Sequence, residues 1–430
     1  MKQAPTLVSL PIIHPLMYCS AIVLSVASPA GHAGTELSRF LSSSAGRFDI
    51  ASFADDISVR TNTTTGNNAP PVAVPVPVPV PAASIYNLYV DSNGDDNGTG
   101  SISAPFRTIS KAAAMAKPST TIHVAPGIYA GNVTTNNSGT SSGRIRFESS
   151  ARWGARIVGS GSGAHWTNNG DFVDVSGFDI SGPGRLGIMN NGSNTLINGN
   201  HVHDLTFSGG CNGLGGAGIV NADYKAADAD IIGNVVHDIG IQGACNGAQG
   251  IYHSNLRGKI MNNIVYRVSA WGIHLWHAAN NVVVANNTVF NNGSARMGGG
   301  IATGSGDSPG GIVLDSTKVI NNIVYNNPGA SITQFCYAGV SCIGSSNITT
   351  NNLVYGNGHG ISLRVGAATG SIAADPQFVN YRPDGTGDYR LQRGSPAVNA
   401  GATNAAPSYD IDNAVRPSGG APDIGAYESF

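Results

Sequence analysis

Two short stretches of the sequence place a proton-transferring side chain at the same offset from a Gly-Ile pair. The pair at 250–251 is followed by Tyr252, and the pair at 272–273 is followed by His274. If each pair begins a β-strand with its isoleucine facing inward, the next side chain faces outward, because side chains alternate along a strand. Adjacent strands lie ~5 Å apart, so Tyr252 and His274 are expected to be neighbours on one outer face.

Further residues near these two add groups for acid–base chemistry. Tyrosine, histidine and lysine can transfer protons, and arginine can neutralise a carboxylate. The candidate catalytic residues are Tyr252, His274, Lys225, Arg267 and His253. Strict alternation places His253 inward, so a buried structural histidine and a functional histidine both remain open.

The elements that must position these residues follow from two recurrent motifs. The motif Asn-x-Val recurs at spacings of 34, 29, 24, 35 and 30 residues, and Gly-Ile or its equivalent recurs beside it. The repeated asparagines are Asn200, Asn234, Asn263, Asn287, Asn322 and Asn352. A period of this length is typical of a solenoid. The short β-rich runs predict an all-β stack of coils, with inward Val and Ile forming the core. We expect each asparagine to occupy a left-handed corner and to hydrogen-bond to the asparagine of the next coil.

The regions flanking the repeats have different compositions. An Ala-rich stretch at 107–117 predicts a helix that caps the solenoid, with Thr108 or Ser110 as the N-cap and Pro118 ending it. A strand is expected over 121–125. Residues 84–430 are expected to form the β-helix domain, with the N-terminal cap and first coils at 84–165 and a C-terminal capping segment at 366–430.

The N-terminal part of the sequence predicts export. Residues 1–33 have a short apolar run and end in small residues that fit a signal-peptidase site after Ala33. The run is too short to span a bilayer, and no other segment is expected to do so. Residues 34–60 have no clear period, and residues 61–83 form a Thr/Asn-rich and then Pro/Val-rich linker.

Charge and cysteine content agree with an exported protein. The chain has 23 basic and 25 acidic residues, so no basic face is implied and nucleic acid is not expected as a partner. Cys211, Cys245, Cys336 and Cys342 form an even set outside the leader, which favours disulfides, with zinc as the weaker alternative. Cys211 and Cys245 each begin a Cys-Asn-Gly triplet, which suggests equivalent loops on neighbouring repeats. Cys336 and Cys342 are expected to close a short local loop.

Both ends of the domain resemble a known group of proteins. The segments that carry the resemblance are 89–91, 93–99, 104–109, 121–124 and 126–129 at the start, and 375–378, 388–391, 394–397, 399–401 and 422–428 at the end. They are similar to segments of secreted right-handed parallel β-helix proteins, a group that includes the pectate-lyase-like polysaccharide lyases. The resemblance implies a right-handed parallel β-helix over roughly residues 85–430 that acts on a polysaccharide.

The same resemblance implies β-elimination on an acidic, uronate-containing polysaccharide. In that chemistry Tyr252, His274, Lys225 and Arg267 would share the roles of base, acid and neutralising cation, with Trp276 as a surface for sugar stacking. The candidate substrate-binding residues are Trp276, His277, Asp223, His203, His237, Asp204 and Asp238. We expect all of them within reach of one strand face on three neighbouring coils. The clustered aspartates that hold calcium in pectate lyases are not found, so calcium remains a candidate cofactor without an assigned site.

Two other functions remain open at this stage. A β-helix glycoside hydrolase needs two carboxylates flanking the bond, which Asp204, Asp223 and Asp238 can supply. A non-catalytic glycan-binding surface protein or adhesin also suits a long repeat joined to a spacer. We expect a secreted or periplasmic monomer that most resembles a lyase.

Overall fold

The computed structural model describes residues 85–429, except 162, 208–210, 212–214, 241–243, 295, 306–311 and 338–340. The predicted signal peptide, the segment at 34–60 and the linker at 61–83 therefore lie outside the described residues. Within the described part of the chain, no helix is long and apolar enough to cross a membrane.

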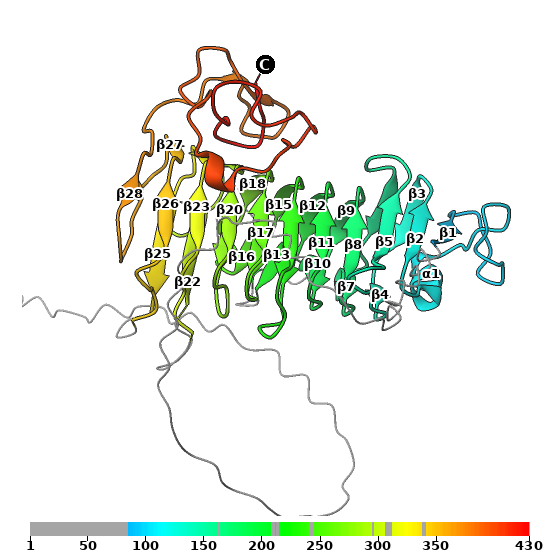
Figure 1. Cartoon of the computed structure of the whole chain (residues 1–430). Helices are drawn as coiled ribbons and strands as arrows, with labels where there is room; N and C mark the ends of the chain where they lie inside the picture. Colours follow the sequence, from blue (N-terminus) through cyan, green and yellow to red (C-terminus); the bar gives the residue numbers. More distant parts are fainter. Residues whose placement is uncertain are drawn as a thin grey trace, which may run out of the picture. The chain divides into compact units, whose positions relative to one another are not determined.

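Three long parallel sheets form the body of the domain (Figure 1). The chain visits sheet 1, sheet 2 and sheet 3 in turn, and each round of three strands makes one coil. Sheet 1 contains β1 (Tyr86–Val90), β2 (Thr120–Val124), β5 (Ile145–Ser149), β8 (Val173–Ser176), β11 (Leu196–Asn198), β14 (Asp230–Ile232), β17 (Lys259–Met261), β20 (Val283–Ala285), β23 (Lys318–Ile320), β26 (Ile348–Thr350) and β28 (Ala368–Thr369). Sheet 2 contains β3 (Gly127–Ala130), β6 (Ala155–Val158), β9 (Asp179–Pro183), β12 (His201–Thr206), β15 (Val235–Ile239), β18 (Ile264–Val268), β21 (Thr288–Phe290), β24 (Ile323–Tyr325) and β27 (Leu353–Tyr355). Sheet 3 contains β4 (Val133–Thr135), β7 (Ala164–Asn168), β10 (Leu186–Asn190), β13 (Gly216–Asn221), β16 (Ala248–His253), β19 (Trp271–Leu275), β22 (Gly299–Ser305) and β25 (Ala330–Cys336). The predicted right-handed parallel β-helix is confirmed.

Packing inside the coils explains why the two sequence motifs recur together. The isoleucines of the Gly-Ile pairs are aligned on successive strands of sheet 3 and are buried. A Cβ added to Gly250 would lie 2.5 Å from a methyl carbon of Val265, and one added to Gly272 would lie 2.5 Å from a methyl carbon of Val289. Five valines of the Asn-x-Val motifs fill the space left by a glycine on sheet 3, because interiors of this kind are close-packed. They are Val202, Val236, Val265, Val289 and Val324.

The predicted asparagine ladder joins the coils at the turn between sheet 1 and sheet 2. The Nδ2 atom of Asn263 donates to Oδ1 of Asn287 at 3.0 Å, and Asn287 donates to Asn322 at 2.9 Å. These side chains are fully buried, so each ladder bond satisfies a polar group that water cannot reach. One detail of the prediction is wrong: the left-handed corner is the residue before the ladder asparagine, as at Asn286 with φ 55°.

The N-terminal helix is shorter than the predicted 107–117. Helix α1 (Ile109–Met115) begins after Thr108, whose side chain accepts a hydrogen bond from the backbone N of Lys111. Its inner face buries Ile109, Ala112 and Ala113 in the core of the first coils. The helix ends before Pro118 because Ala116 is already extended, which suits the residues that approach a proline.

The C-terminal segment covers the outer face of sheet 2 from β18 to β27 (Figure 1). It contains the antiparallel pair β29 (Phe378–Asn380) and β30 (Asp388–Leu391) and the short 3₁₀ helix η1 (Thr403–Ala405). A second apolar core lies at this contact, formed by Ile264, Tyr266, Phe290, Ile323, Tyr325, Leu353, Phe378, Tyr389, Leu391, Ala397, Ile411, Ile424 and Ala426. The cover reaches Val235 on β15, and Asp412 of this segment lies 4.0 Å from Arg152 of an earlier coil.

Candidate functional site

Tyr252 and His274 lie side by side on the outer face of sheet 3. They are paired in register on β16 and β19, and their ring centroids are 5.2 Å apart in an edge-to-face arrangement. Both side chains are partly exposed. The adjacency expected from the two Gly-Ile pairs is confirmed.

Two turns extend this pair into a larger cluster. The ring of Tyr224 stacks on His277 at 4.2 Å, and His277 lies 6.0 Å from Tyr252. Tyr224 reaches His277 because the turn after β13 is longer than the turn after β16, and so extends past the intervening coil. We call Tyr224, Tyr252, His274 and His277 the sheet 3 patch. Tyr224 was not among the predicted site residues, although its position in a long inserted turn could have indicated that it reaches the neighbouring coils.

The predicted Lys225 and Asp223 stand on the same turn as Tyr224. Both are exposed, and Asp223 Oδ1 accepts a hydrogen bond from the backbone N of Lys225 at 2.9 Å. This local bond fixes the turn in the manner typical of aspartate. The patch therefore has one cation and one carboxylate at its edge on this turn.

His274 has an environment that disfavours the charged imidazolium. Its Nδ1 atom is buried and has no hydrogen-bond partner, while the rest of the ring keeps some exposure. Burial, together with repulsion from His277, lowers the pKa of His274 to about 3. The neutral form of the imidazole is therefore the favoured one at physiological pH.

His253 lies inside the coil stack. Its Nδ1 atom is 3.0 Å from Nδ2 of Asn221 and its Nε2 atom is 2.8 Å from the carbonyl oxygen of Arg257. It is fully buried, and burial lowers its pKa to about 4. His253 was expected to be either a buried structural histidine or a functional one, and the structure shows that it is buried.

Trp276 does not form an open stacking surface, so its predicted role is corrected. Its side chain is only 4% exposed and packs against Phe335 and Tyr337, with ring centroids 5.7 and 5.6 Å away. Gly304 on the next coil leaves room for the indole, since a Cβ there would lie 2.4 Å from it. Residues of β25 and the turn after it thus cover the tryptophan. Trp271, 6.2 Å from His274, is the partly exposed tryptophan next to the patch.

Five predicted residues lie on sheet 2 instead of sheet 3. They are His203, Asp204, His237, Asp238 and Arg267, on β12, β15 and β18. The chain turns from sheet 2 to sheet 3 between β12 and β13, and again between β15 and β16. A side chain that faces outward before such a turn therefore lies on the outer face of sheet 2. Arg267 forms an ion pair with Asp238 at 2.7 Å. The expectation of one trough containing all candidates is therefore wrong.

The sheet 2 residues form a cluster of their own with two that were not predicted, His201 and Asp179. Nε2 of His201 lies 2.8 Å from Nε2 of His237, and the ring of His201 stacks on that of His203 at 4.0 Å. Asp179 Oδ2 is 3.1 Å from Nδ1 of His201 and 3.0 Å from Nε2 of His203. His201 is the middle residue of an Asn-x-Val motif, where most repeats carry an apolar or Thr side chain, and this departure was the available signal.

Burial and hydrogen bonding act in opposite directions on the pKa values of this cluster. Burial opposes the charge on His203, but hydrogen bonds to Asp179 and Asp204 outweigh it and raise the pKa of His203. Burial dominates at His201 and lowers its pKa, despite the hydrogen bond to Asp179. Burial likewise opposes ionisation of Asp179, yet hydrogen bonds from both histidines hold its pKa well below its ordinary value.

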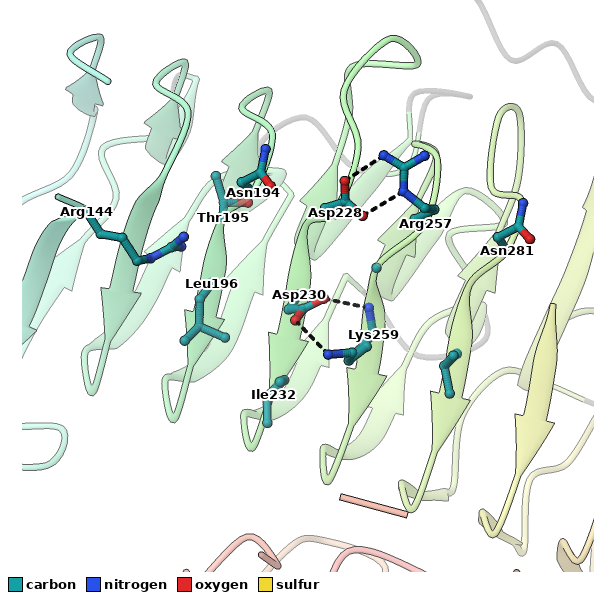
Figure 2. A pocket seen from close by; sticks show the side chains of 12 residues that line it. Arg144, Asn194, Thr195, Leu196, Asp228, Asp230, Ile232, Arg257, Lys259 and Asn281 are labelled. Atoms are coloured by element: carbon teal, nitrogen blue, oxygen red, sulfur yellow. Dashed lines mark hydrogen bonds and ion pairs between the residues drawn. The ribbon is translucent and has the colours of Figure 1, made fainter. Parts of the chain in front are cut away.

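A hollow of about 550 Å³ lies on the outer face of sheet 1, where charged side chains pair with each other (Figure 2). Asp228 forms an ion pair with Arg257 at 2.6 Å, and Asp230 lies 3.9 Å from Lys259. Figure 2 shows both pairs bridging neighbouring coils. These four charged side chains pair across the coils, so we assign them a structural role.

The described residues do not assemble a calcium site. Among them, the group of three or more His, Cys, Asp or Glu side chains close enough to share an ion is His201, His203 and His237. Calcium prefers six to eight oxygen ligands. Asp204 and Asp238 are each bound to a histidine, and Asp223 lies apart on sheet 3, so the oxygen ligands needed for calcium are not brought together.

Both predicted disulfides are present. Cys211–Cys245 links the turns that lead into β13 and β16, and Cys336–Cys342 closes a short loop after β25. The first bridge therefore holds together the turns that precede two strands beside the patch. Disulfides of this kind persist in oxidising compartments, which agrees with export.

Comparisons with known proteins identify the fold. A family model described as a protein of unknown function (DUF1565) matches residues 92–136. No curated protein sequence matches the chain. The solved structure of pectate lyase Pel9A is similar with a TM-score of 0.53 and 20% identity, covering 81% of this chain and 97% of that one. A rhamnogalacturonan lyase has a TM-score of 0.47 and 14% identity, covering 72% and 96%. An alginate lyase from Paenibacillus sp. str. FPU-7 has a TM-score of 0.39 and 17% identity, covering 62% and 96%.

The chain thus has a right-handed parallel β-helix fold that is similar to the fold of pectate lyase Pel9A. At these identities the similarity describes the fold, and the activity must be argued from the site.

Proposed function

We propose that the protein is an exported polysaccharide lyase that cleaves a uronate-containing polysaccharide by β-elimination at the sheet 3 patch. The observation that carries this proposal is the pairing in register of His274 with Tyr252 on the outer face of sheet 3, with ring centroids 5.2 Å apart. The two disulfides and the lyase-type fold support export and a polysaccharide substrate.

The two side chains suit opposite halves of the elimination. The neutral imidazole of His274 accepts the proton from the carbon beside the substrate carboxylate, while a carbon–carbon double bond forms and the bond to the glycosidic oxygen breaks. A phenol keeps its proton at neutral pH, so Tyr252 donates a proton to the leaving oxygen. General acid–base catalysis of this kind contributes about 10²- to 10⁴-fold in rate.

The surrounding residues bind the polymer. Lys225, exposed on the neighbouring turn, supplies the positive charge that offsets the substrate carboxylate. The rings of Tyr224 and His277 stack on each other and add a flat surface for sugars. Arg267 takes no part because it lies on sheet 2 in an ion pair with Asp238.

Hydrolysis is the weaker alternative for this patch. A glycoside hydrolase needs two carboxyl groups that flank the bond. Of the three predicted aspartates, Asp204 and Asp238 are bound to histidines on sheet 2, and Asp223 alone stands beside the patch.

The test is incubation of the purified protein with a panel of uronate-containing polysaccharides, with neutral glucans as controls. A lyase gives new ultraviolet absorbance from unsaturated ends in step with new reducing ends. Reducing ends without absorbance would replace the proposal with hydrolysis, and binding with neither product would replace it with a glycan-binding function.

A further inference from the structure

We propose that His201, His203 and His237 form a binding site for a divalent transition-metal ion, with zinc as the foremost candidate, on the outer face of sheet 2. The site is separate from the sheet 3 patch, and the proposal does not rest on the lyase function.

The three imidazoles converge from two neighbouring coils. His201 and His203 project from β12, and His237 is paired with His203 on the adjacent strand β15. One nitrogen from each ring lies within 4.8 Å of the other two. Three histidines at this spacing are a common protein ligand set for zinc, with a fourth position left for water or another ligand.

Each ring is backed by a carboxylate on the nitrogen that faces away from the others. The Nδ1 atom of each ring lies close to a carboxylate oxygen: His201 to Asp179 Oδ2 at 3.1 Å, His203 to Asp204 Oδ2 at 2.7 Å, and His237 to Asp238 Oδ2 at 2.6 Å. Metal-binding histidines almost always donate their second ring N–H to such a partner, which fixes the tautomer and makes the free nitrogen more basic. The three contacts therefore leave Nε2 of His201 and of His237 as ligand atoms, and Nε2 of His203 becomes one when it gives up its contact with Asp179.

Without an ion, this arrangement brings hydrogen-bond acceptors together. If each Nδ1 donates to its carboxylate, the Nε2 atoms of His201 and His237 face each other at 2.8 Å without a proton to share. Nε2 of His203 hydrogen-bonds to Asp179 Oδ2 at 3.0 Å, so an ion bound there would replace the proton of this bond. A cation among the three Nε2 atoms resolves the contact between His201 and His237. Tetrahedral zinc has bonds of about 2.0–2.1 Å, so the three nitrogens, which lie within 4.8 Å of one another, would adjust to the spacing around one ion.

Neighbouring side chains hold the imidazoles in place and leave access from solvent. Trp153 stacks on His201 with ring centroids 4.5 Å apart, and Tyr266 stacks on His237 at the same separation. The side chains of the three histidines remain 13–20% exposed, so an ion can enter without unfolding of the coils. Oδ1 of Asp179 is buried without a hydrogen-bond partner, and its nearest cation is Arg156 at 3.7 Å. It supplies a further polar atom at the site.

The ligand chemistry selects the class of ion. Imidazole nitrogen suits zinc, copper and nickel, whereas calcium and magnesium require oxygen ligands. A bound ion would cross-link β12 to β15.

The experiment is titration of the full chain, prepared without a histidine tag and stripped with a chelator, with zinc chloride in a calorimeter. We expect one equivalent to bind, and an intense visible absorption of four-coordinate cobalt when cobalt(II) replaces zinc. His237→Ala and the milder His237→Gln should abolish stoichiometric binding, and Asp238→Asn should weaken it about 10- to 100-fold. His359→Ala, at an exposed histidine elsewhere, is the matched control.

Thermal unfolding of each variant shows whether the fold is kept. Absence of binding by the folded wild-type protein would overturn the proposal. Binding that persists unchanged in His237→Gln and in His203→Gln would also overturn it, since the ion would then lie on other residues.

Discussion

The side-chain amide of Asn221 lies 3.0 Å from Nδ1 of His253, inside the coil stack. Asn190 donates to Asn221 at 2.9 Å, and Asn168 donates to Asn190 at 2.7 Å, so His253 extends an internal row of asparagines. The histidine occupies an asparagine position and brings a titratable group into a fully buried row.

The first prediction is that acid destabilises the fold through His253. Burial lowers its pKa to about 4 from the ordinary 6.5, so the unfolded chain binds this proton more readily. The contribution of the neutral ring is therefore complete above pH 6.5 and is lost as the pH falls toward 4. It amounts to at most about 3 kcal/mol. Urea unfolding between pH 7 and pH 4 should show this loss, and His253→Asn should make the curve shallower.

His359→Asn provides the control for that measurement, because His359 is exposed. Its curve should match that of the unaltered protein. A curve for His253→Asn that is as steep as the wild-type curve would show that other groups cause the acid sensitivity.

The second prediction concerns catalysis. Tyr252→Phe removes the proposed acid and His274→Ala the proposed base, so each should lower kcat by about 10²- to 10⁴-fold while the unfolding temperature changes little. The measurement is the initial rate of unsaturated product formation. Tyr355→Phe and His359→Ala alter exposed residues outside the patch and should retain full activity. Normal rates in both patch variants would place the chemistry elsewhere.

The third prediction follows from the same low pKa at His274. Because burial and His277 hold it at about 3, the base remains neutral throughout the mildly acidic range. The pH profile of kcat/KM for the free protein should therefore show no acid limb near 6.5. A limb near 6.5 that remains in the active protein would contradict this prediction.

The fourth prediction tests the ladder between sheet 1 and sheet 2. Asn287→Ala removes the hydrogen bonds of this side chain. Asn287 accepts one from Asn263, and it donates one to Asn322 and one to the carbonyl oxygen of Ile260. The groups left behind are buried without partners, so the free energy of unfolding should fall by about 2–4 kcal/mol. Asn191, just after β10, is partly exposed and donates to Oδ1 of Asn169 at 2.8 Å, so Asn191→Ala should cost less than about 1 kcal/mol by chemical denaturation. Equal costs would show that burial does not set the value of these bonds.

The fifth prediction concerns the C-terminal segment. Arg416 and Glu428 form a fully buried ion pair at 3.1 Å. Glu428→Gln removes the carboxylate that pairs with the buried guanidinium, while Asp410 and Asp423 remain near it, so the stability should fall by about 3 kcal/mol. Asp388→Asn, in the exposed pair with Arg390, should cost about 1 kcal/mol or less. Similar effects in a denaturation experiment would contradict this ranking.

The features that the sequence predicted correctly are contacts between equivalent positions of successive coils. The asparagine ladder, the isoleucine column and the pairing of Tyr252 with His274 all follow from repeat spacing and alternation. The sequence did not predict what depends on the direction of the chain after a turn. Arg267 was assigned to the wrong face for that reason. Trp276 was expected to be open because its cover comes from Phe335 and Tyr337, which no local pattern connects to it.

The corner asparagines that precede the ladder also bind the C-terminal segment. Nδ2 of Asn262, Asn286 and Asn321 donates to the carbonyl oxygens of Tyr409, Asp423 and Ala402, and Asn351 does the same to Ala400. The C-terminal segment thus forms one such hydrogen bond with each of four consecutive coils. Duplication or loss of a coil between β18 and β27 would shift every one of these bonds, whereas a change in coil number before β15 would leave them intact. Natural variation in the length of such a protein is therefore expected upstream.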